Sequence, residues 1–250
     1  MNRFLTKVLM ACSLISSPVL ADDMGIDDPS RNAYYEALKG KNVVFVPLAL
    51  GFDLTDGWYA GMKADLEPLG VNMQVRDPNW SADAGARAIS SLIGEKPDLI
   101  VVHNPDVQTY AKLLKKAEKR GIHVVQINMK SAYSTDAFVG ADYIEIGELA
   151  GQAIVDNCGD GTSGEVAIVQ GVLTAAASAY QLRGVSNILS KHSNIKIVSN
   201  QAADWDSSKA RTITETTLQQ NPNLCGIIGF WDGMDAVSYT HLRAHETRIH

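Results

Sequence analysis

Short runs of β-branched and other apolar residues recur along this chain roughly every 25 to 30 residues, and amphipathic stretches separate most of them. The runs are residues 42–46, 71–75, 98–102, 122–127, 165–169, 195–198 and 225–230. Helical spacing is clearest at residues 56–69, where Trp58 and Met62 share one face, and residues 107–120 follow the same spacing. This alternation of strand and helix predicts an α/β fold with doubly wound parallel sheets.

The sequence also repeats itself weakly, which indicates two lobes of similar topology. The matching stretches are residues 80–81, 86–89 and 97–100 in the first half and residues 205–206, 210–213 and 222–225 in the second. Residues that commonly punctuate α/β folds are the alternative explanation of this match. We expect a first lobe at residues 41–140 and a second lobe at residues 141–236. Because only three strands are predicted from residue 165 onward, the second lobe is expected to be incomplete.

Residues 1–21 have the pattern of a cleaved secretory signal peptide. Basic Arg3 and Lys7 precede an apolar stretch, and a small residue, Ala21, ends the segment. The alternatives are a membrane anchor and, at Cys12, a lipid anchor. Serines and a proline interrupt the apolar stretch, whereas a span needs about 20 continuous apolar residues. We therefore expect export to the periplasm.

At the other end, residues 237–250 depart from the α/β periodicity and contain three of the six histidines. They resemble the translation of a transposase-type sequencing adapter read through in frame. An ordinary polar helix is the alternative. We expect this tail to be non-native.

Export makes Cys158 and Cys225 candidates for a disulfide. Each lies ahead of a predicted strand, which would bring both to the same edge of one sheet. The alternative is a pair of buried thiols that behave as small hydrophobic residues. The sequence contains no CxxC motif or Cys/His cluster, so we expect neither a metal site nor a cofactor.

The charge of the chain and its lack of enzyme motifs argue against several classes of function. The formal net charge is −6 without a block of Lys and Arg, which argues against nucleic acid or anionic lipid as the main partner. The sequence has no nucleophile elbow, Walker loop, HExxH motif or dinucleotide fingerprint. The glycine-rich residues 159–164 precede a strand instead of opening a helix, and so they resemble a linker. We expect a protein that binds a small neutral molecule and is not an enzyme.

Parallel sheets bind ligands beyond the carboxyl ends of their strands. The loops at those ends carry aromatic, amide and carboxylate side chains, which suit a sugar because rings cover its C–H face and polar groups bond to its hydroxyls. The candidates are Phe52, Asp53, Asn104, Asn128, Met129, Trp205, Trp231 and Asp232. Structural alternatives exist: Asp204 or Asp206 would cap a helix, Trp80 would pack under its loop, and a lone His103 would be structural. Trp231 and Asp232 have no such alternative role that the sequence makes evident.

In order and spacing, several short motifs resemble the ribose-type (type I) periplasmic sugar-binding proteins. The motifs are Pro97-Asp98-Leu99-Ile100-Val101 before Asn104-Pro105, Gly121-Ile122-His123-Val124-Val125, Gly147-Glu148-Leu149-Ala150-Gly151, Gly164-Glu165-Val166-Ala167, and Asn221-Pro222-Asn223-Leu224 before Asp232. The resemblance covers residues 41–236. It implies two lobes that close over a sugar or polyol, and a closed form that the membrane permease of an ABC transporter recognises. It also implies a monomer.

The resemblance places ligand contacts by position. In the first lobe these are Phe52, Leu54, Thr55, Asn128 and Met129, and in the second they are Gln181, Trp205, Trp231 and Asp232. Ribose-type members usually have an Asp-Arg pair where this chain has Asn128 and Met129, an Arg at Gln181 and an Asn at Trp231. Hydrogen bonds to charged groups contribute about 1.5 to 3 kcal/mol against about 1 for neutral ones, so ribose itself is disfavoured. A periplasmic sensor that presents its ligand to a chemoreceptor or sensor kinase is the alternative function.

Overall fold

The computed structural model describes residues 30–236 and 239–240. The predicted signal peptide and most of the predicted non-native tail lie outside these residues. Helix α1 (Ser30–Leu38) falls almost wholly in a separate unit, and both sheets belong to the unit that begins at Leu38. Among the described helices, none is long and apolar enough to span a bilayer.

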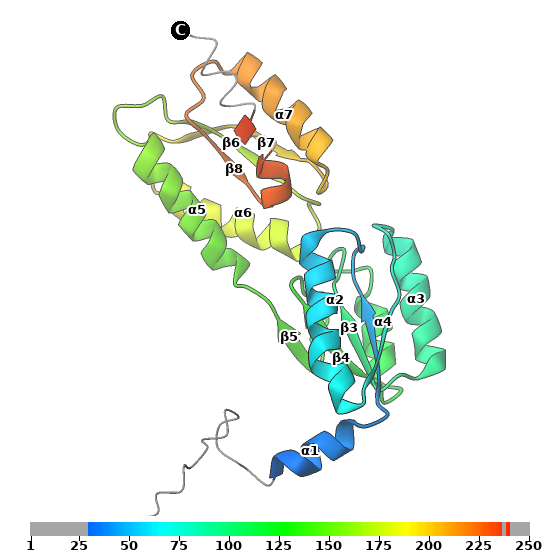
Figure 1. The fold of residues 1–250 in the computed structure, drawn as a ribbon. Helices are drawn as coiled ribbons and strands as arrows, with labels where there is room; N and C mark the ends of the chain where they lie inside the picture. The colour runs from blue at the N-terminus through cyan, green and yellow to red at the C-terminus, as the bar shows by residue number, and fades with distance from the viewer. Residues whose placement is uncertain (1–29, 237–238, 241–250) are drawn as a thin grey trace, which may run out of the picture. The chain divides into compact units, whose positions relative to one another are not determined.

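The first sheet has five parallel strands in the order β2-β1-β3-β4-β5 (Figure 1). Its elements are β1 (Asn42–Val46), α2 (Asp53–Leu66), η1 (Glu67–Leu69), β2 (Asn72–Val75), α3 (Ala82–Glu95), β3 (Leu99–Val102), α4 (Ala111–Glu118), β4 (His123–Ile127) and β5 (Ala137–Val139). The predicted doubly wound α/β fold is confirmed. The second predicted helix, residues 107–120, is shorter than expected because its first residues form turns.

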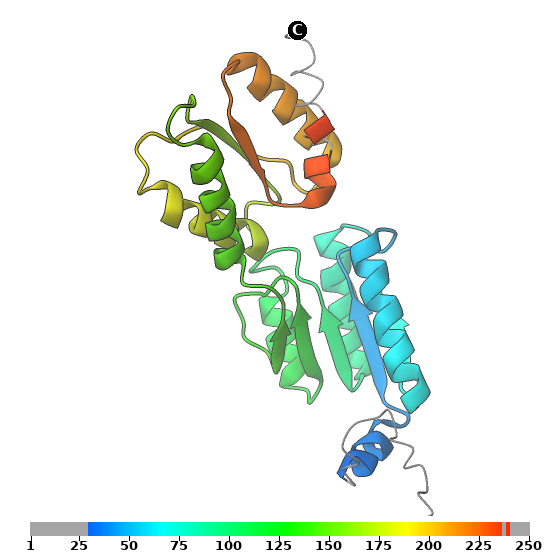
Figure 2. The ribbon, with the colours of Figure 1, turned by 60° about the vertical axis from the view of Figure 1, so that its left-hand side comes forward.

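Helices cover both faces of this sheet (Figure 2). On one face, α3 and α4 pack against Val44, Ile100 and Val124. On the other face, α2 packs against Val43 and Phe45. Successive strand residues point to opposite faces, so the unbroken apolar run of β1 supplies both cores at once.

The second sheet has three parallel strands in the order β7-β6-β8. Its elements are α5 (Tyr143–Cys158), β6 (Glu165–Gln170), α6 (Ala176–Leu189), β7 (Lys196–Ala202), α7 (Ser207–Gln220) and β8 (Gly226–Gly229). Helices α5 and α6 pack on the face of Val166 and Ile168, and α7 packs on the face of Val169. The strand order repeats that of β2, β1 and β3 in the first sheet.

The two lobes also share an unusual turn. Trp80 and the residue before it have φ angles of 66° and 49°, and Trp205 and the residue before it have φ angles of 63° and 54°. Each tryptophan is followed by a helix cap, because Ser81 and Asp206 accept hydrogen bonds from backbone N–H groups of α3 and α7. The same turn in both lobes supports an internal duplication.

Glycines bring α5 and α6 into backbone contact. A Cβ atom on Gly147 of α5 would collide with the carbonyl oxygen of Gln181, and one on Gly184 of α6 would collide with the carbonyl oxygen of Ile144. Only glycine permits helices to approach this closely. This contact packs the first turns of α5 against the middle of α6.

Cys158 and Cys225 form a disulfide in the structure, with 5.7 Å between their Cα atoms. It joins the end of α5 to the residue just before β8, the last strand of the second sheet. Cys158 is buried among the side chains between α5, α6 and the sheet. The bond therefore links one covering helix to an edge strand.

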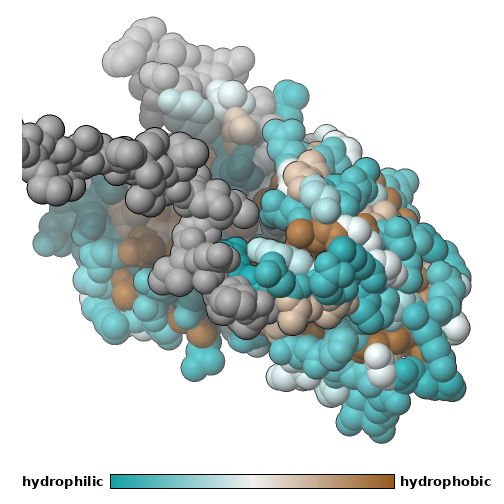
Figure 3. Space-filling view, turned by 60° about the horizontal axis from the view of Figure 1, so that its bottom comes forward, coloured by the Kyte–Doolittle hydropathy of each residue, from teal (hydrophilic) through white to brown (hydrophobic). Residues whose placement is uncertain are grey.

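The face of the molecule drawn in Figure 3 is mainly hydrophilic, and its hydrophobic residues are scattered among polar ones. Scattered apolar residues are normal on a soluble surface and do not by themselves mark an interface.

Candidate functional site

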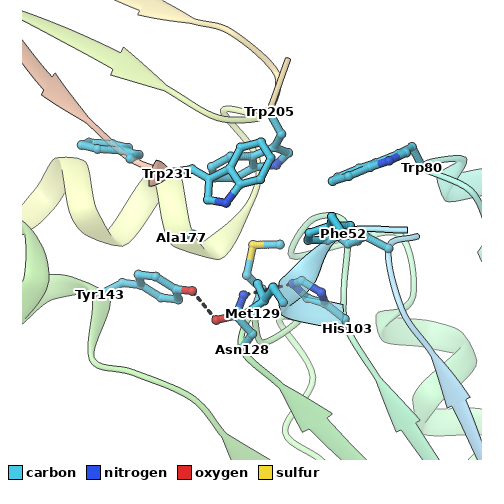
Figure 4. A pocket seen from close by; sticks show the side chains of 12 residues that line it. Phe52, Trp80, His103, Asn128, Met129, Tyr143, Ala177, Trp205 and Trp231 are labelled. Atoms are coloured by element: carbon cyan, nitrogen blue, oxygen red, sulfur yellow. Dashed lines mark hydrogen bonds between the residues drawn. The ribbon is translucent and has the colours of Figure 1, made fainter. Parts of the chain in front are cut away.

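A pocket that is open to solvent lies at the carboxyl ends of strands from both sheets (Figure 4). Loops after β1, β2, β3 and β4, together with the first turn of α2, supply its first-lobe wall. The first turns of α5 and α6 and the loops after β7 and β8 supply the rest. None of its twelve lining residues is Asp, Glu, Lys or Arg. Parallel α/β sheets hold their ligands at this edge, and so this is the candidate binding site.

Four aromatic rings form a continuous run along the pocket. The ring of Phe52 stacks on Trp80 with centroids 5.2 Å apart and meets Trp231 edge-on at 6.2 Å. Trp231 in turn meets Trp205 edge-on at 6.5 Å. We call Trp80, Phe52, Trp231 and Trp205 the aromatic run. It crosses from one lobe to the other and gives the pocket a wide apolar wall.

Trp80 differs from its sequence-based interpretation. Its side chain does not pack under its loop but lines the pocket with 49% of its surface exposed. The reason is the left-handed turn described above, which turns the indole toward Phe52. Two consecutive non-glycine residues at positive φ are costly, and such conformations concentrate at functional sites.

The position of the Trp205 indole depends on Gly171. A Cβ atom on Gly171 would collide with the six-membered ring of this indole. Gly171 follows β6 and does not itself line the pocket. The bare backbone at this point lets the indole lie flat against the loop.

Three neutral polar side chains form a chain of hydrogen bonds at the base of the pocket. The Tyr143 hydroxyl donates to Oδ1 of Asn128 over 2.6 Å, and Nδ2 of Asn128 lies 3.2 Å from Nε2 of His103. Because an amide nitrogen only donates, Nε2 accepts and the imidazole proton resides on Nδ1. Figure 4 shows these three side chains together below the aromatic run. We call them the polar chain.

His103 is buried, with 2% of its surface exposed. Burial lowers the pKa of its imidazole from 6.5 to about 3, so it is neutral near pH 7. Its Nδ1 has no hydrogen-bond partner among the residues that the structure describes. The polar side chains that line the pocket are therefore neutral near pH 7, and the Nδ1–H of His103 is buried without a partner among the described residues.

Six of the residues predicted from the sequence line the pocket. They are Phe52, Leu54, Asn128, Met129, Trp205 and Trp231. Both lobes contribute to this set, as expected of a site between two sheets.

Three predicted residues lie elsewhere. Thr55 is fully buried, and its hydroxyl donates to the carbonyl of Ala49 over 2.6 Å. Asp53 is exposed in the first turn of α2, where a negative charge suits the helix dipole. Asp232 is exposed, and its carboxylate accepts a hydrogen bond from the next backbone N–H. None of the three lines the pocket.

Two further predicted residues hold the backbone of residues that do line it. Asn104 is fully buried and donates through Nδ2 to the carbonyl of Met129 over 2.9 Å. Gln181 is 5% exposed, and its Nε2 lies 3.5 Å from the carbonyl of Phe230. In this structure both side chains position the pocket from behind it.

Sequence reasoning missed six lining residues, which are Leu48, Trp80, His103, Tyr143, Ala177 and Phe230. Trp80 occupies the repeat position of Trp205, so the repeat was a signal that could have found it. His103 and Tyr143 carried no such signal, because a lone histidine or tyrosine beside apolar residues is usually structural. Among the described residues, no group of His, Cys, Asp or Glu side chains is arranged to hold a metal ion.

The family model described as the periplasmic binding protein domain matches residues 43–244 of this chain. The chain is 35% identical over 120 residues to the D-allose-binding periplasmic protein of Escherichia coli K12. This match covers 45% of this chain and 38% of that protein. The chain is 25% identical over 175 residues to the ribose import binding protein of Bacillus subtilis 168. That match covers 70% of this chain and 56% of the relative.

A solved structure of a solute binding protein has the same fold as this chain. An ABC transporter solute binding protein from Burkholderia graminis C4D1M, in complex with D-arabinose, superposes with a TM-score of 0.74 at 25% identity. The match covers 80% of this chain and 69% of that one. The chain thus spans 38 to 56% of the length of the two curated relatives above.

Proposed function

Because the chain belongs to the periplasmic binding protein domain family and has its type I fold, we propose that it captures a small neutral sugar or polyol in the periplasm. In this proposal it delivers the ligand to the permease of an ABC transporter. It acts as a monomer and catalyses no reaction.

The aromatic run carries this proposal. Indole and phenyl rings from both lobes face one pocket, and rings of this kind cover the C–H faces of a sugar. In the polar chain, the Asn128 amide keeps one N–H and the Tyr143 oxygen keeps lone pairs, and these groups can bond to the hydroxyls of a sugar. Apolar rings with a few fixed polar groups are the usual composition of a small-molecule site.

The charge of the pocket supports a neutral ligand. Among the described residues, none that lines the pocket is charged and His103 is neutral, so none of them forms an ion pair with an ammonium, carboxylate or phosphate group. Burying an unpaired charge costs far more than burying a paired one. Amino acids and anionic metabolites are therefore poor candidates.

The names of the relatives support the class of ligand and the partner. D-allose, ribose and D-arabinose are neutral polyhydroxylated molecules, and the relatives that bind them are named as periplasmic, import or ABC transporter proteins. A periplasmic location also agrees with the signal-peptide pattern of residues 1–21.

A thermal-shift screen of sugars, polyols and amino acids, followed by calorimetric titration of each hit, tests the proposal. We expect at least one sugar or polyol to raise the melting temperature and to bind with a stoichiometry of one. Trp231→Ala should weaken that binding by about tenfold, whereas Leu149→Ala, at an exposed position outside the pocket, should not. Stabilisation by amino acids alone would refute the proposal.

A further inference from the structure

We propose that the outer face of α4 is a docking surface for an acidic helix of a partner protein. Five basic side chains gather there, and we call them the basic stripe: Lys112, Lys115, Lys116, Lys119 and Arg120. All five are exposed, whereas Leu114 and Ala117 of the same helix are buried against the first sheet. No residue of the basic stripe lines the ligand pocket. The inference therefore does not depend on what the pocket binds.

The helix brings together charges that the sequence separates. Leu113, Leu114 and Ala117 interrupt the basic residues, so the sequence has no continuous block of Lys and Arg. In the structure, each residue of the basic stripe has another three or four positions away, on α4 or in the turn that ends it. Residues at that spacing are neighbours on a helix surface, with Cβ atoms about 5 to 6 Å apart. At a rise of about 1.5 Å per residue, the basic stripe is about 12 Å long.

The described residues do not compensate these charges. No residue of the basic stripe forms an ion pair with a carboxylate among them. The ammonium of Lys115 lies 5.8 Å from the centroid of the Tyr133 ring. Glu118 is the one acid within residues 112–120, and its carboxylate accepts a hydrogen bond from the backbone N–H of Asp136 over 2.8 Å.

This arrangement of charge lowers the stability of the free protein. Like charges three and four residues apart destabilise a helix, and exposed helix faces usually mix the two signs. Lys112 also lies in the first turn of α4, where the helix dipole disfavours a positive charge. An acidic partner that covers the basic stripe would offset this repulsion.

The surroundings of the basic stripe favour a narrow partner. Outside residues 112–120, the chain has 17 Lys and Arg against 27 Asp and Glu. Carboxylates also border the basic stripe, at Glu118 and at the exposed Asp136. A flat anionic bilayer would bring its charge within a Debye length, about 8 Å, of these carboxylates as well. A helix about 10 Å wide can lie along the basic stripe alone.

An acidic helix also matches the spacing of the basic stripe. Carboxylates three and four residues apart on such a helix repeat at the same interval, so they can pair with the basic residues one to one. Each exposed ion pair contributes little, and the affinity would come from several pairs in register. Complementary charge also speeds association and makes it sensitive to salt.

Two alanine-rich helical peptides of identical composition test the inference. One carries four glutamates on a single face, at spacings of three and four residues, and the other spreads the four glutamates around the helix. We expect the full chain to bind the one-face peptide at least about threefold more tightly, as measured by fluorescence anisotropy in about 50 mM salt. Raising the salt to about 300 mM should remove most of this binding.

Variants tie the binding to the basic stripe. Lys116→Gln/Lys119→Gln should weaken binding of the one-face peptide by about threefold or more. Lys191→Gln/Lys196→Gln is the matched control, because it removes two exposed positive charges from the second lobe, and should change binding by less than about twofold. The stripe variant should melt no lower than the wild type, because it relieves repulsion on α4. A loss of binding would then not reflect unfolding.

Three results would overturn the inference. Equal affinity for the two peptides would show attraction by total charge, without a surface that recognises spacing. Unchanged affinity in Lys116→Gln/Lys119→Gln would place the binding elsewhere on the molecule. Binding to vesicles of phosphatidylglycerol and phosphatidylcholine that this variant abolishes, without binding to either peptide, would make the partner a lipid surface. None of these results bears on the ligand pocket, whose proposed function is tested with sugars.

Discussion

The Tyr143 hydroxyl donates a 2.6 Å hydrogen bond to Oδ1 of Asn128, and this bond joins the first turn of α5 to the residue after β4. Asn128 has a positive φ of 57°, a conformation that asparagine adopts more readily than most residues. Its amide also contacts His103. One side chain therefore connects three segments, two from the first lobe and one from the second.

Tyr143→Phe should destabilise the protein by about 1 kcal/mol, because it removes one hydrogen bond and leaves Oδ1 of Asn128 without its donor. Urea denaturation followed by circular dichroism measures the change. Tyr180→Phe is a matched control, because that hydroxyl makes no hydrogen bond within the described residues. Equal losses in the two variants would show that the bond to Asn128 contributes nothing.

The buried imidazole of His103 should make the protein sensitive to acid. Its pKa is 6.5 when unfolded and about 3 when folded, so below pH 6.5 the unfolded chain takes up a proton that the folded chain does not. Stability is then fully present above pH 6.5 and falls as the pH drops toward 3. Between pH 7 and pH 4 the loss from this residue is on the order of 3 kcal/mol.

His103→Gln should therefore flatten the fall in stability between pH 7 and pH 4, as measured by urea denaturation at each pH. His192→Gln, at a position away from the pocket, controls for the loss of a histidine. An identical pH dependence in His103→Gln and the wild type would place this imidazole in contact with water.

The buried carboxyl of Asp235 should make the folded protein less stable as the pH rises. Burial, reinforced by the charge of Asp232, raises the pKa of its carboxyl from 3.8 to about 6, and its buried Oδ1 has no partner. The stability that this group contributes is present below pH 3.8 and is lost as the pH rises through 6. Asp235→Asn should therefore stabilise the protein at pH 7 by about 1 to 2 kcal/mol after allowance for solvent screening, and by little at pH 4.

Thermal melts of Asp235→Asn at pH 4 and pH 7 provide the measurement. Asp65→Asn, in an exposed position on α2, removes the same charge without a change in burial. A stabilisation by Asp65→Asn as large as that by Asp235→Asn would attribute the gain to net charge.

The strands were the most predictable part of the fold. Residues 42–46 form β1 as predicted, because an unbroken run of β-branched residues is typical of a strand that is buried on both faces. Strand β7 was predicted at residues 195–198 but continues to Ala202. The last four residues of this strand, 199–202, are mainly polar. An edge strand needs no apolar pattern where it faces solvent. The three exposed residues of β5 had no pattern that could be detected.

The site was less predictable, for a physical reason. Strand ends could be located from the sequence, and so Phe52, Asn128 and Trp231 were found. Whether a loop side chain turns into the pocket depends on backbone angles, and hydrophobicity carries no information about those. Trp80 was expected to pack under its loop but lines the pocket. Asp232 was expected to contact the ligand but is exposed to solvent outside the pocket.

Gly147→Ala should destabilise the second lobe by about 2 kcal/mol or more, because a methyl group there would push α6 away from α5. Gly57→Ala is the matched control on α2, where a Cβ atom meets nothing within 4 Å. That control should be neutral or stabilising by up to about 1 kcal/mol, as expected for alanine in an open helix position. Chemical denaturation of both variants gives the comparison, and similar values for the two would contradict the close helix contact.

Reduction of the Cys158–Cys225 bond should lower stability by about 4 kcal/mol, since the bond closes a loop with a sequence separation of 67. Melting temperatures with and without dithiothreitol measure the effect, and Cys225→Ser should reproduce it without reductant. A melting temperature that dithiothreitol leaves unchanged would show that the two thiols are not bridged in solution.

Gly171 never touches the pocket, yet the place of the Trp205 indole depends on its missing side chain. A relative with alanine at this position could keep all twelve lining residues and still present a differently tilted ring to its ligand. Ligand preference in such proteins can thus diverge through a single methyl group behind the wall. A comparison limited to contact residues would find two identical sites where the molecules have two different shapes.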